Sequence, residues 1–199
     1  MNHILIIVGH PSPDSFNAAL TQTAKAAISD AGGQYLVHDP YQDGFDPVLS
    51  FRKSSDPLTK RYTRDLKEVG GYIVIHPDWW GQPPAMLKGY LDLVFQDNVA
   101  YHYPEGGGRS PEGLLSGTAA LVLNTSNTAP EEERDRFGGT LEHIWRDCVF
   151  GPCGVGSVQR RVFGPVADST EEGRTQWLGE ARELVADYVA RNHLVGTVS

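Results

Sequence analysis

The sequence has few cysteines and no arrangement of them that would build a disulfide framework or a metal centre. Two occur among 199 residues, Cys148 and Cys153, and their spacing is not that of a C-x-x-C redox pair. The seven histidines lack the H-E-x-x-H or clustered Cys/His spacing of zinc sites. We therefore expect two free, buried thiols and no metal.

Basic residues and long apolar runs are also scarce. The chain has 17 Lys and Arg against 25 Asp and Glu, a formal net charge of −8, which argues against nucleic-acid binding because that needs a positive surface. The apolar run at residues 4–8 is far too short for a membrane span or for the core of a signal peptide. We predict a cytoplasmic protein without membrane insertion.

Three motifs of nucleotide and nucleophile sites are missing. The chain has no G-K-[ST] loop of a nucleoside triphosphatase and no G-x-G-x-x-G of a Rossmann dinucleotide site. It also has no G-x-S-x-G elbow, so a serine hydrolase, although left open, lacks its usual signature.

What the chain does contain is an alternation of strands and helices. Continuous apolar runs rich in branched residues are typical of strands buried on both faces of a parallel sheet. Between these runs lie segments whose apolar residues recur at the spacing of a helix. We predict strands at residues 3–8, 34–37, 72–76, 118–123 and 157–166, the last at a sheet edge. We predict helices from residue 16 to the glycines at 32 and 33, at 52–69, 84–95 and 131–150, and from 169 to about 191. Such an order indicates a three-layer α/β domain.

The loop at residues 9–17 is a candidate anion site. It brings His10, the hydroxyls of Ser12 and Ser15, the amide of Asn17 and several backbone N–H groups to a helix N-terminus. The aligned peptide dipoles favour an anion there by roughly 0.3–1 kcal/mol at exposed sites. Ser15 alone would be explained as a helix cap. The hypothesis of a phosphate site therefore depends on the whole loop.

A loop with two adjacent tryptophans is the second candidate. Trp79 and Trp80 follow the strand predicted at residues 72–76, and Pro84, a residue suited to a first helical turn, comes soon after them. Large aromatic residues seldom occupy such a loop unless a flat group covers them, and loops at the carboxyl ends of strands form the ligand crevice of α/β sheets. The alternative is a loop tryptophan packed under a neighbouring helix.

Two motifs resemble those of the flavodoxin-like NAD(P)H:quinone oxidoreductases, a family that includes flavoproteins of the modulator-of-drug-activity type. His10, Ser15, Phe16 and Asn17 match the His-x-x-x-x-Ser-Phe-Asn string that holds the phosphate or pyrophosphate of the family's flavin. Residues 84–89 read PAMLKG and match the Pro-Ala-x-Leu-Lys-Gly helix after the family's proline-tryptophan loop. The resemblance implies a flavodoxin-like fold with strand order 2-1-3-4-5 and one flavin-binding domain over residues 1–199.

The resemblance also implies which residues contact the ligands. The expected flavin-binding residues are His10, Ser15, Phe16, Asn17, Pro77, Asp78, Trp79, Trp80, Gly81, Asn124, Thr125, Ser126 and Asn127. Trp80, Tyr101 and Tyr103 are expected in the substrate pocket, the tyrosines often coming from the partner subunit. The family commonly has Thr-Thr-Gly-Gly where residues 124–127 stand, and this chain keeps one threonine and neither glycine.

These expectations describe an oxidoreductase in which NAD(P)H and then a quinone, or a similar small acceptor, use one open face of a flavin. FAD is expected from the His-x-x-x-x-Ser-Phe-Asn string, with FMN as the alternative, and the resemblance implies a homodimer. No catalytic residue is assigned. The Tyr/His pair of the animal enzymes has no match, because His143 lies out of register and no tyrosine occurs between Tyr103 and Tyr188. The alternative function is a regulatory flavoprotein subunit of a potassium-efflux system in the membrane.

Overall fold

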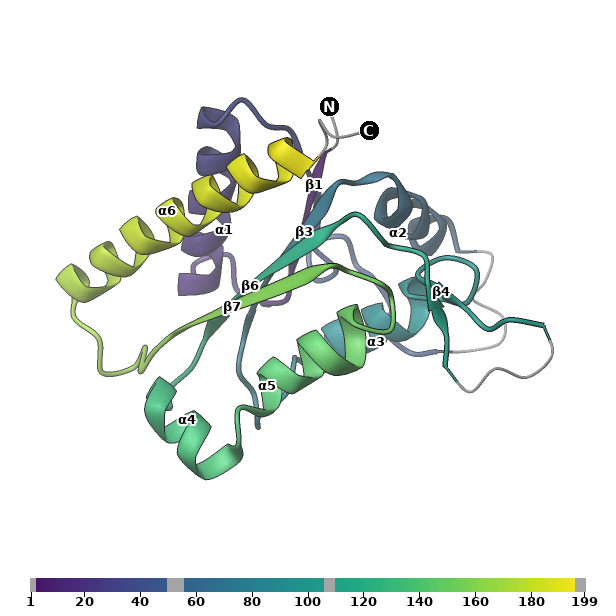
Figure 1. The fold of residues 1–199 in the computed structure, drawn as a ribbon. Coiled ribbons are helices and arrows are strands. Elements are labelled where there is room, and N and C mark those ends of the chain that lie inside the picture. Colours follow the sequence, from purple (N-terminus) through teal and green to yellow (C-terminus); the bar gives the residue numbers. More distant parts are fainter. Residues whose placement is uncertain (1–2, 50–55, 106–109, 196–199) are drawn as a thin grey trace.

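The computed structural model describes residues 3–49, 56–105 and 110–195, and its centre is a five-stranded parallel sheet (Figure 1). The strands are β1 (Ile4–Val8), β2 (Tyr35–His38), β3 (Gly71–Pro77), β6 (Ala119–Thr125) and β7 (Ser157–Phe163), in the order β2-β1-β3-β6-β7. The numbers differ from the predicted 2-1-3-4-5 because two short strands intervene in the chain. These strands, β4 (Tyr101–His102) and β5 (Glu112–Gly113), pair with each other outside the sheet.

Helices cover both faces of the sheet. α1 (Phe16–Asp30) and α6 (Glu171–Val195) lie on one face, and α2 (Pro57–Glu68), α3 (Ala85–Val94) and α5 (Thr140–His143) lie on the other (Figure 1). Alternate residues of β1 serve the two layers: Leu5 and Ile7 enter one apolar core, and Ile6 enters the other. This two-residue period is the geometry of a strand, and it explains why the run is apolar throughout.

The last helix, predicted to end at about residue 191, continues to Val195, and two other predicted helices also differ from those in the structure. The helix predicted at 52–69 begins at Pro57, where the Asp56 carboxylate accepts the Thr59 N–H at 2.8 Å as a cap. Residues 52–55 of that prediction lie outside the described residues. The single helix predicted at 131–150 is wrong. α4 (Pro130–Phe137) ends at Gly138, and both Gly138 and Gly139 have left-handed backbone angles, with φ of 67° and 64°.

The chain after this break continues as α5 and then as one wide, π-helical stretch, Ile144–Phe150. That stretch holds Trp145 and Phe150 in the core, whereas Cys148 faces solvent. The expectation of two buried thiols is therefore right for Cys153 and wrong for Cys148.

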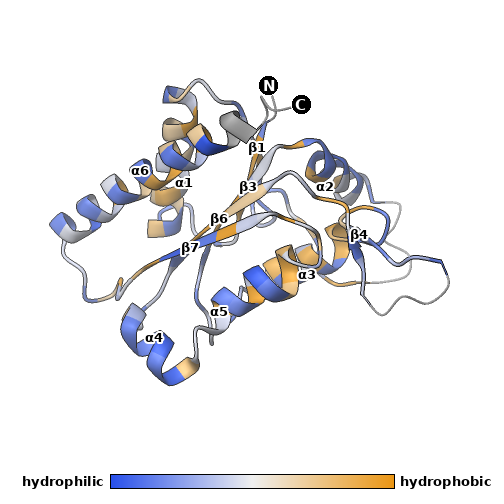
Figure 2. Ribbon diagram, viewed as in Figure 1, coloured by the Kyte–Doolittle hydropathy of each residue, from blue (hydrophilic) through white to orange (hydrophobic). Residues whose placement is uncertain are grey.

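The strand predicted at residues 157–166 can be compared with β7. β7 is an edge strand, as predicted, but it ends at Phe163 rather than at residue 166. Hydropathy follows the layers, with apolar residues along the central strands and on α3, and hydrophilic residues over most of α4 (Figure 2). Over the part of the chain that the structure describes, no helix combines the length and the apolar character needed to cross a bilayer.

Candidate functional site

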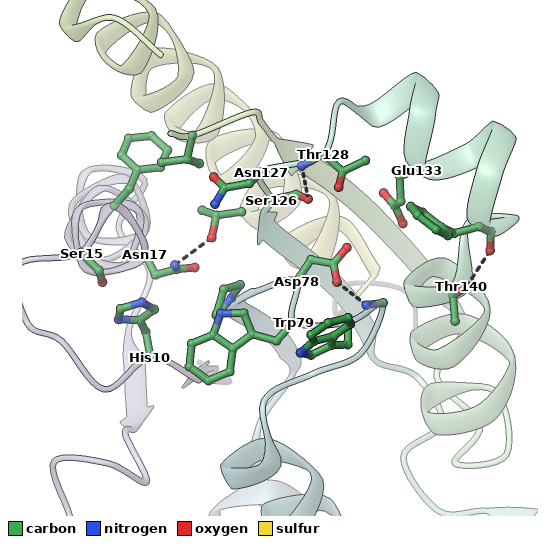
Figure 3. A pocket seen from close by; sticks show the side chains of 17 residues that line it. His10, Ser15, Asn17, Asp78, Trp79, Ser126, Asn127, Thr128, Glu133 and Thr140 are labelled. Atoms are coloured by element: carbon green, nitrogen blue, oxygen red, sulfur yellow. Dashed lines mark hydrogen bonds between the residues drawn. The ribbon is translucent and has the colours of Figure 1, made fainter. Parts of the chain in front are cut away.

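A cavity of about 640 Å³ opens at the carboxyl ends of β1, β3 and β6 (Figure 3). It brings together all three segments that the sequence singled out: the first loop, the tryptophan loop and the polar end of the fourth strand of the sheet. Its walls are formed by His10, Ser15, Phe16, Asn17, Pro77, Asp78, Trp79, Trp80, Gly81, Thr125, Ser126, Asn127, Thr128, Glu133, Phe137, Thr140 and Val166. Twelve of these were predicted flavin contacts.

The first loop is held by hydrogen bonds of its own. Ser15 is the N-cap of α1, and its hydroxyl accepts the Ala18 N–H at 3.2 Å and donates to the Ser12 carbonyl at 2.9 Å. The Ser12 N–H donates to Nδ1 of His10 at 3.0 Å. Nδ1 also lies 3.3 Å from the Ser12 carbonyl oxygen. In the tautomer in which Nδ1 accepts from the Ser12 N–H, the ring carries its proton on Nε2, which can then donate to a ligand. The N–H groups of Phe16 and Asn17 have no helical carbonyl to bind in a first turn.

Asn17 joins the first loop to the strand end. Its side chain is 3% exposed, and its Nδ2 donates to Oγ1 of Thr125 at 2.9 Å. Its Oδ1 is buried and has no hydrogen-bond partner among the described residues. A buried acceptor without a partner costs about 1–3 kcal/mol, so this atom is suited to a donor on a bound molecule.

The tryptophan loop is a tight turn. Trp79 and Gln82 exchange two backbone hydrogen bonds, at 3.1 and 3.2 Å, and the two residues between them have positive φ, 62° at Trp80 and 70° at Gly81. This is the pattern of a type I′ turn, in which a bulky side chain such as that of Trp80 is strained. The turn leaves the Trp80 side chain 99% exposed and that of Trp79 43% exposed.

Asp78 connects this turn to the sheet. Its carboxylate accepts the Gly81 N–H at 2.7 Å, and its own N–H donates to the Thr125 carbonyl at 2.6 Å. Burial raises the pKa of the Asp78 carboxyl, and the nearby charge of Glu133 raises it further, whereas the hydrogen bond from Gly81 lowers it. The strained turn therefore has one fixed position against the end of β6.

Asn124, a predicted flavin contact, is not on the cavity wall. It is fully buried beneath it, with Nδ2 2.9 Å from Nε2 of His76 and Oδ1 accepting from Nε of Arg160 at 2.6 Å. Trp145 also donates to Nε2 of His76, at 2.8 Å. Burial lowers the pKa of His76 to about 4, so the ring is neutral and accepts at Nε2. Both polar atoms of the Asn124 side chain are hydrogen-bonded within the protein, so this residue supports the cavity floor rather than contacting a ligand.

The two tyrosines predicted for the substrate pocket do not reach Trp80. Tyr101 of β4 and Tyr103, which follows the end of that strand, lie beside each other with ring centres 5.8 Å apart. Tyr101 lines a second cavity of about 480 Å³, together with residues of α3 and the π-helical stretch. Within one chain, Trp80 and Tyr101 therefore line different cavities, and Tyr103 lines neither of them.

Five residues of the wall were missed: Thr128, Glu133, Phe137, Thr140 and Val166. Three of them lie on α4 or just after the Gly138–Gly139 break, in a segment that the sequence predicts to be one continuous helix. The glycine pair itself was the signal that could have located them, because two successive glycines are a turn mark. His143, which the sequence leaves without a catalytic role, is exposed, and its Nδ1 lies 2.9 Å from Oδ2 of Asp147.

Comparison with known proteins gives relatives along most of the chain. A protein of Haemophilus influenzae named as an uncharacterized NAD(P)H oxidoreductase is 28% identical over 176 residues, covering 83% of this chain and 85% of that protein. The mouse ribosyldihydronicotinamide dehydrogenase [quinone] is 26% identical over 210 residues, covering 91% and 90%. An FMN-dependent NADH:quinone oxidoreductase of Nitratidesulfovibrio vulgaris is 22% identical over 147 residues, covering 72% and 69%.

Solved structures resemble the fold closely. Smu.1420 of Streptococcus mutans aligns with a TM-score of 0.83 and 26% identity, covering 93% of this chain and 99% of that one. The NAD(P)H:quinone oxidoreductase of Methanothermobacter marburgensis aligns with a TM-score of 0.77 and 24% identity, covering 93% and 98%. The family model described as the flavodoxin-like fold matches residues 2–185. The chain therefore belongs to the family of proteins with the flavodoxin-like fold.

Proposed function

We propose that this protein is a flavin-dependent NAD(P)H:quinone oxidoreductase, in which a bound flavin takes two electrons from NAD(P)H and gives them to a quinone. The observation that carries the proposal is the convergence of an anion-binding loop, an aromatic turn and a polar strand end around one cavity. The relatives named as oxidoreductases support an enzyme rather than a regulatory subunit.

The residues present fit a flavin. The His10 ring and the first turn of α1 offer donors to a phosphate. The Asn17 Oδ1 is a buried acceptor that a donor on the flavin could satisfy. Trp79 offers an aromatic face beside His10, with the two ring centres 6.2 Å apart. Stacking of a flat ring on such a surface contributes on the order of 0.5–1.5 kcal/mol beyond area burial. These residues would bind and orient the flavin.

FMN is the flavin that we propose. The relative from Nitratidesulfovibrio vulgaris is named as FMN-dependent, and the names of the relatives give no support to the expectation of FAD. Both flavins carry the ring and the first phosphate, so the mass of the flavin that heat releases from the protein distinguishes them. A mass equal to that of FAD would refute this part of the proposal.

A cytoplasmic homodimer acting on a small acceptor completes the proposal. Support for the dimer comes from the position of Tyr101 and Tyr103, which cannot line the Trp80 cavity of their own chain. A partner subunit would bring its own tyrosines there. The mass of the protein in solution, measured by light scattering, tests the dimer, and a monomer at micromolar concentration would contradict it.

The function is tested by visible absorption under anaerobic conditions. We expect flavin bands that bleach with NADH or NADPH and return when a quinone is added. Asn17→Ala and Ser116→Ala form a matched pair, since Asn17 lines the cavity and Ser116 is an exposed residue outside it. We expect the Asn17 variant alone to bind flavin more weakly. A colourless protein that takes up neither FMN nor FAD would refute the proposed function.

A further inference from the structure

α4 is attached to the rest of the molecule in an uncommon way. Helices usually pack through an apolar stripe. Of the eight residues of α4, all described, Glu133 alone is buried, at 4% exposure. Figure 2 shows the helix as hydrophilic over most of its length. The side chain that fixes α4 to the sheet is therefore a carboxylate.

The partner of Glu133 is an arginine on the edge strand. Nη2 of Arg160 on β7 lies 3.0 Å from Oε1 and 3.1 Å from Oε2 of Glu133, and the two side chains are 7% and 6% exposed. Arg160 is fixed in turn by Asn124, which bonds His76. One continuous set of hydrogen bonds thus runs from α4 through β7 and β6 to β3. An ion pair this deeply buried is strongly unfavourable to break from one side.

The flanks of α4 are suited to movement. The helix begins at Pro130, directly after Ala129, and is followed by Gly138 and Gly139, which adopt left-handed angles that few other residues tolerate. A helix with one buried residue and a glycine pair at its end has the marks of a segment with low local stability. The position of α4 therefore depends on the pair between Glu133 and Arg160.

This position shapes the cavity. Glu133 and Phe137 of α4 and Thr140 just beyond it form one side of the wall. Figure 3 shows Glu133 and Thr140 on one side of the cavity, and His10 and Ser15 of the first loop on the other side. A shift of α4 would widen the cavity at the side remote from the loop that we assign to the flavin phosphate.

We propose that Glu133 is a positioning residue: its ion pair with Arg160 holds α4 as the wall against which the acceptor substrate rests. The identification of the acceptor as a quinone rests on the proposed function, whereas the attachment of α4 does not. Without the pair, α4 moves outward and the acceptor binds less well. Flavin binding, which depends on the opposite side of the cavity, stays near that of the wild type.

Hydrogen exchange measured by mass spectrometry on the full chain tests the attachment. We expect Glu133→Ala to speed exchange in residues 130–137 by about tenfold or more, with β1 and α1 as protected as before. Glu133→Gln should give a smaller increase, because its amide oxygen still accepts from Arg160. The control is Glu132→Ala. Glu132 pairs with Arg136 within α4, so its loss weakens the helix without releasing it from the sheet.

Steady-state kinetics with a soluble quinone test the consequence. We expect Glu133→Ala to raise the KM for the quinone about fivefold or more and to leave kcat within about twofold, the signature of lost substrate binding. Unchanged exchange in Glu133→Ala, or an equal increase in Glu132→Ala, would overturn the proposal. So would a loss of kcat at constant KM, because Glu133 would then act on the reacting atoms.

Two further outcomes are informative. If Glu133→Ala does not fold, Glu133→Gln decides, because it keeps the shape and one hydrogen bond. If the wild type binds no flavin, the proposed function fails, and the exchange experiment still decides whether Glu133 holds α4.

Discussion

The buried histidine at the end of β2 gives the protein a pH-dependent stability that can be worked out from the structure. His38 is 1% exposed, and its Nδ1 lies 2.7 Å from the Tyr90 hydroxyl. Its ring stacks on Tyr62 with centres 3.9 Å apart, and Nε2 donates to Asp65 at 3.4 Å. Burial lowers the pKa of His38 from 6.5 to about 4, although Asp65 opposes the shift.

The sign follows from which state binds the proton. Between pH 6.5 and pH 4 the unfolded chain is protonated at residue 38 and the folded chain is not, so acidification stabilises the unfolded chain. From pH 7 to pH 5 this one group lowers the free energy of unfolding by ~2 kcal/mol, and by ~3 kcal/mol once the pH is well below 4. The contribution is fully present above pH 6.5 and is lost as the pH falls.

Urea unfolding at pH 7 and pH 5 measures this contribution. His38→Gln has no titrating group, although its amide can still donate and accept. We expect the variant to be less stable at pH 7, since it loses the stacked ring. Its further loss on going to pH 5 should be smaller than that of the wild type by ~2 kcal/mol. Equal losses in the two proteins would show that His38 is not held neutral in the fold, and the reasoning would fail.

Three substitutions test other parts of the structure. Gly89→Ala would place a Cβ 2.2 Å from the Pro47 carbonyl oxygen, so we expect a loss of ~1–3 kcal/mol in thermal or urea unfolding; unchanged stability would contradict the close packing of this loop on α3. Trp80→Asn should relieve the left-handed strain and raise stability by ~1 kcal/mol while slowing quinone reduction; a less stable variant would refute the strain. Ser15→Ala removes the cap that accepts the Ala18 N–H, and we expect a loss of ~1 kcal/mol together with weaker flavin binding by fluorescence titration; a loss of flavin affinity without any loss of stability would separate the two roles.

The sequence predicted the parts of the site that lie next to a strand end. Ser15, Trp79 and Thr125 each come at or after the end of an apolar run that is typical of a buried strand, and parallel strands bring their carboxyl ends to one edge. The strand pattern also predicted the sheet and its two helical layers. At these strand ends, the local sequence pattern is sufficient to predict where the residues lie in the fold.

Other features depend on contacts that no local pattern encodes. Asn124 stands in a polar run and was read as a flavin contact, yet alternation along β6 turns it inward to Arg160, 36 residues away. Glu133 is one of three consecutive acidic residues in a segment that was predicted to be a continuous helix, and the sequence does not distinguish it from its neighbours. Its burial depends on Arg160, which is distant in the sequence, so the pairing can be recognised only from the three-dimensional structure.

The exposed Trp80 has a consequence for behaviour in solution. Trp80 is 99% exposed and Phe137 is 51% exposed, and both line the same cavity, so they form an apolar rim on a molecule whose formal charge is −8. Two copies that approach through this rim gain apolar contact but repel each other through their like charges. At physiological ionic strength the Debye length is about 8 Å, and added salt shortens it. Self-association should therefore strengthen as salt concentration rises, and dilution at low ionic strength should favour the separated chains.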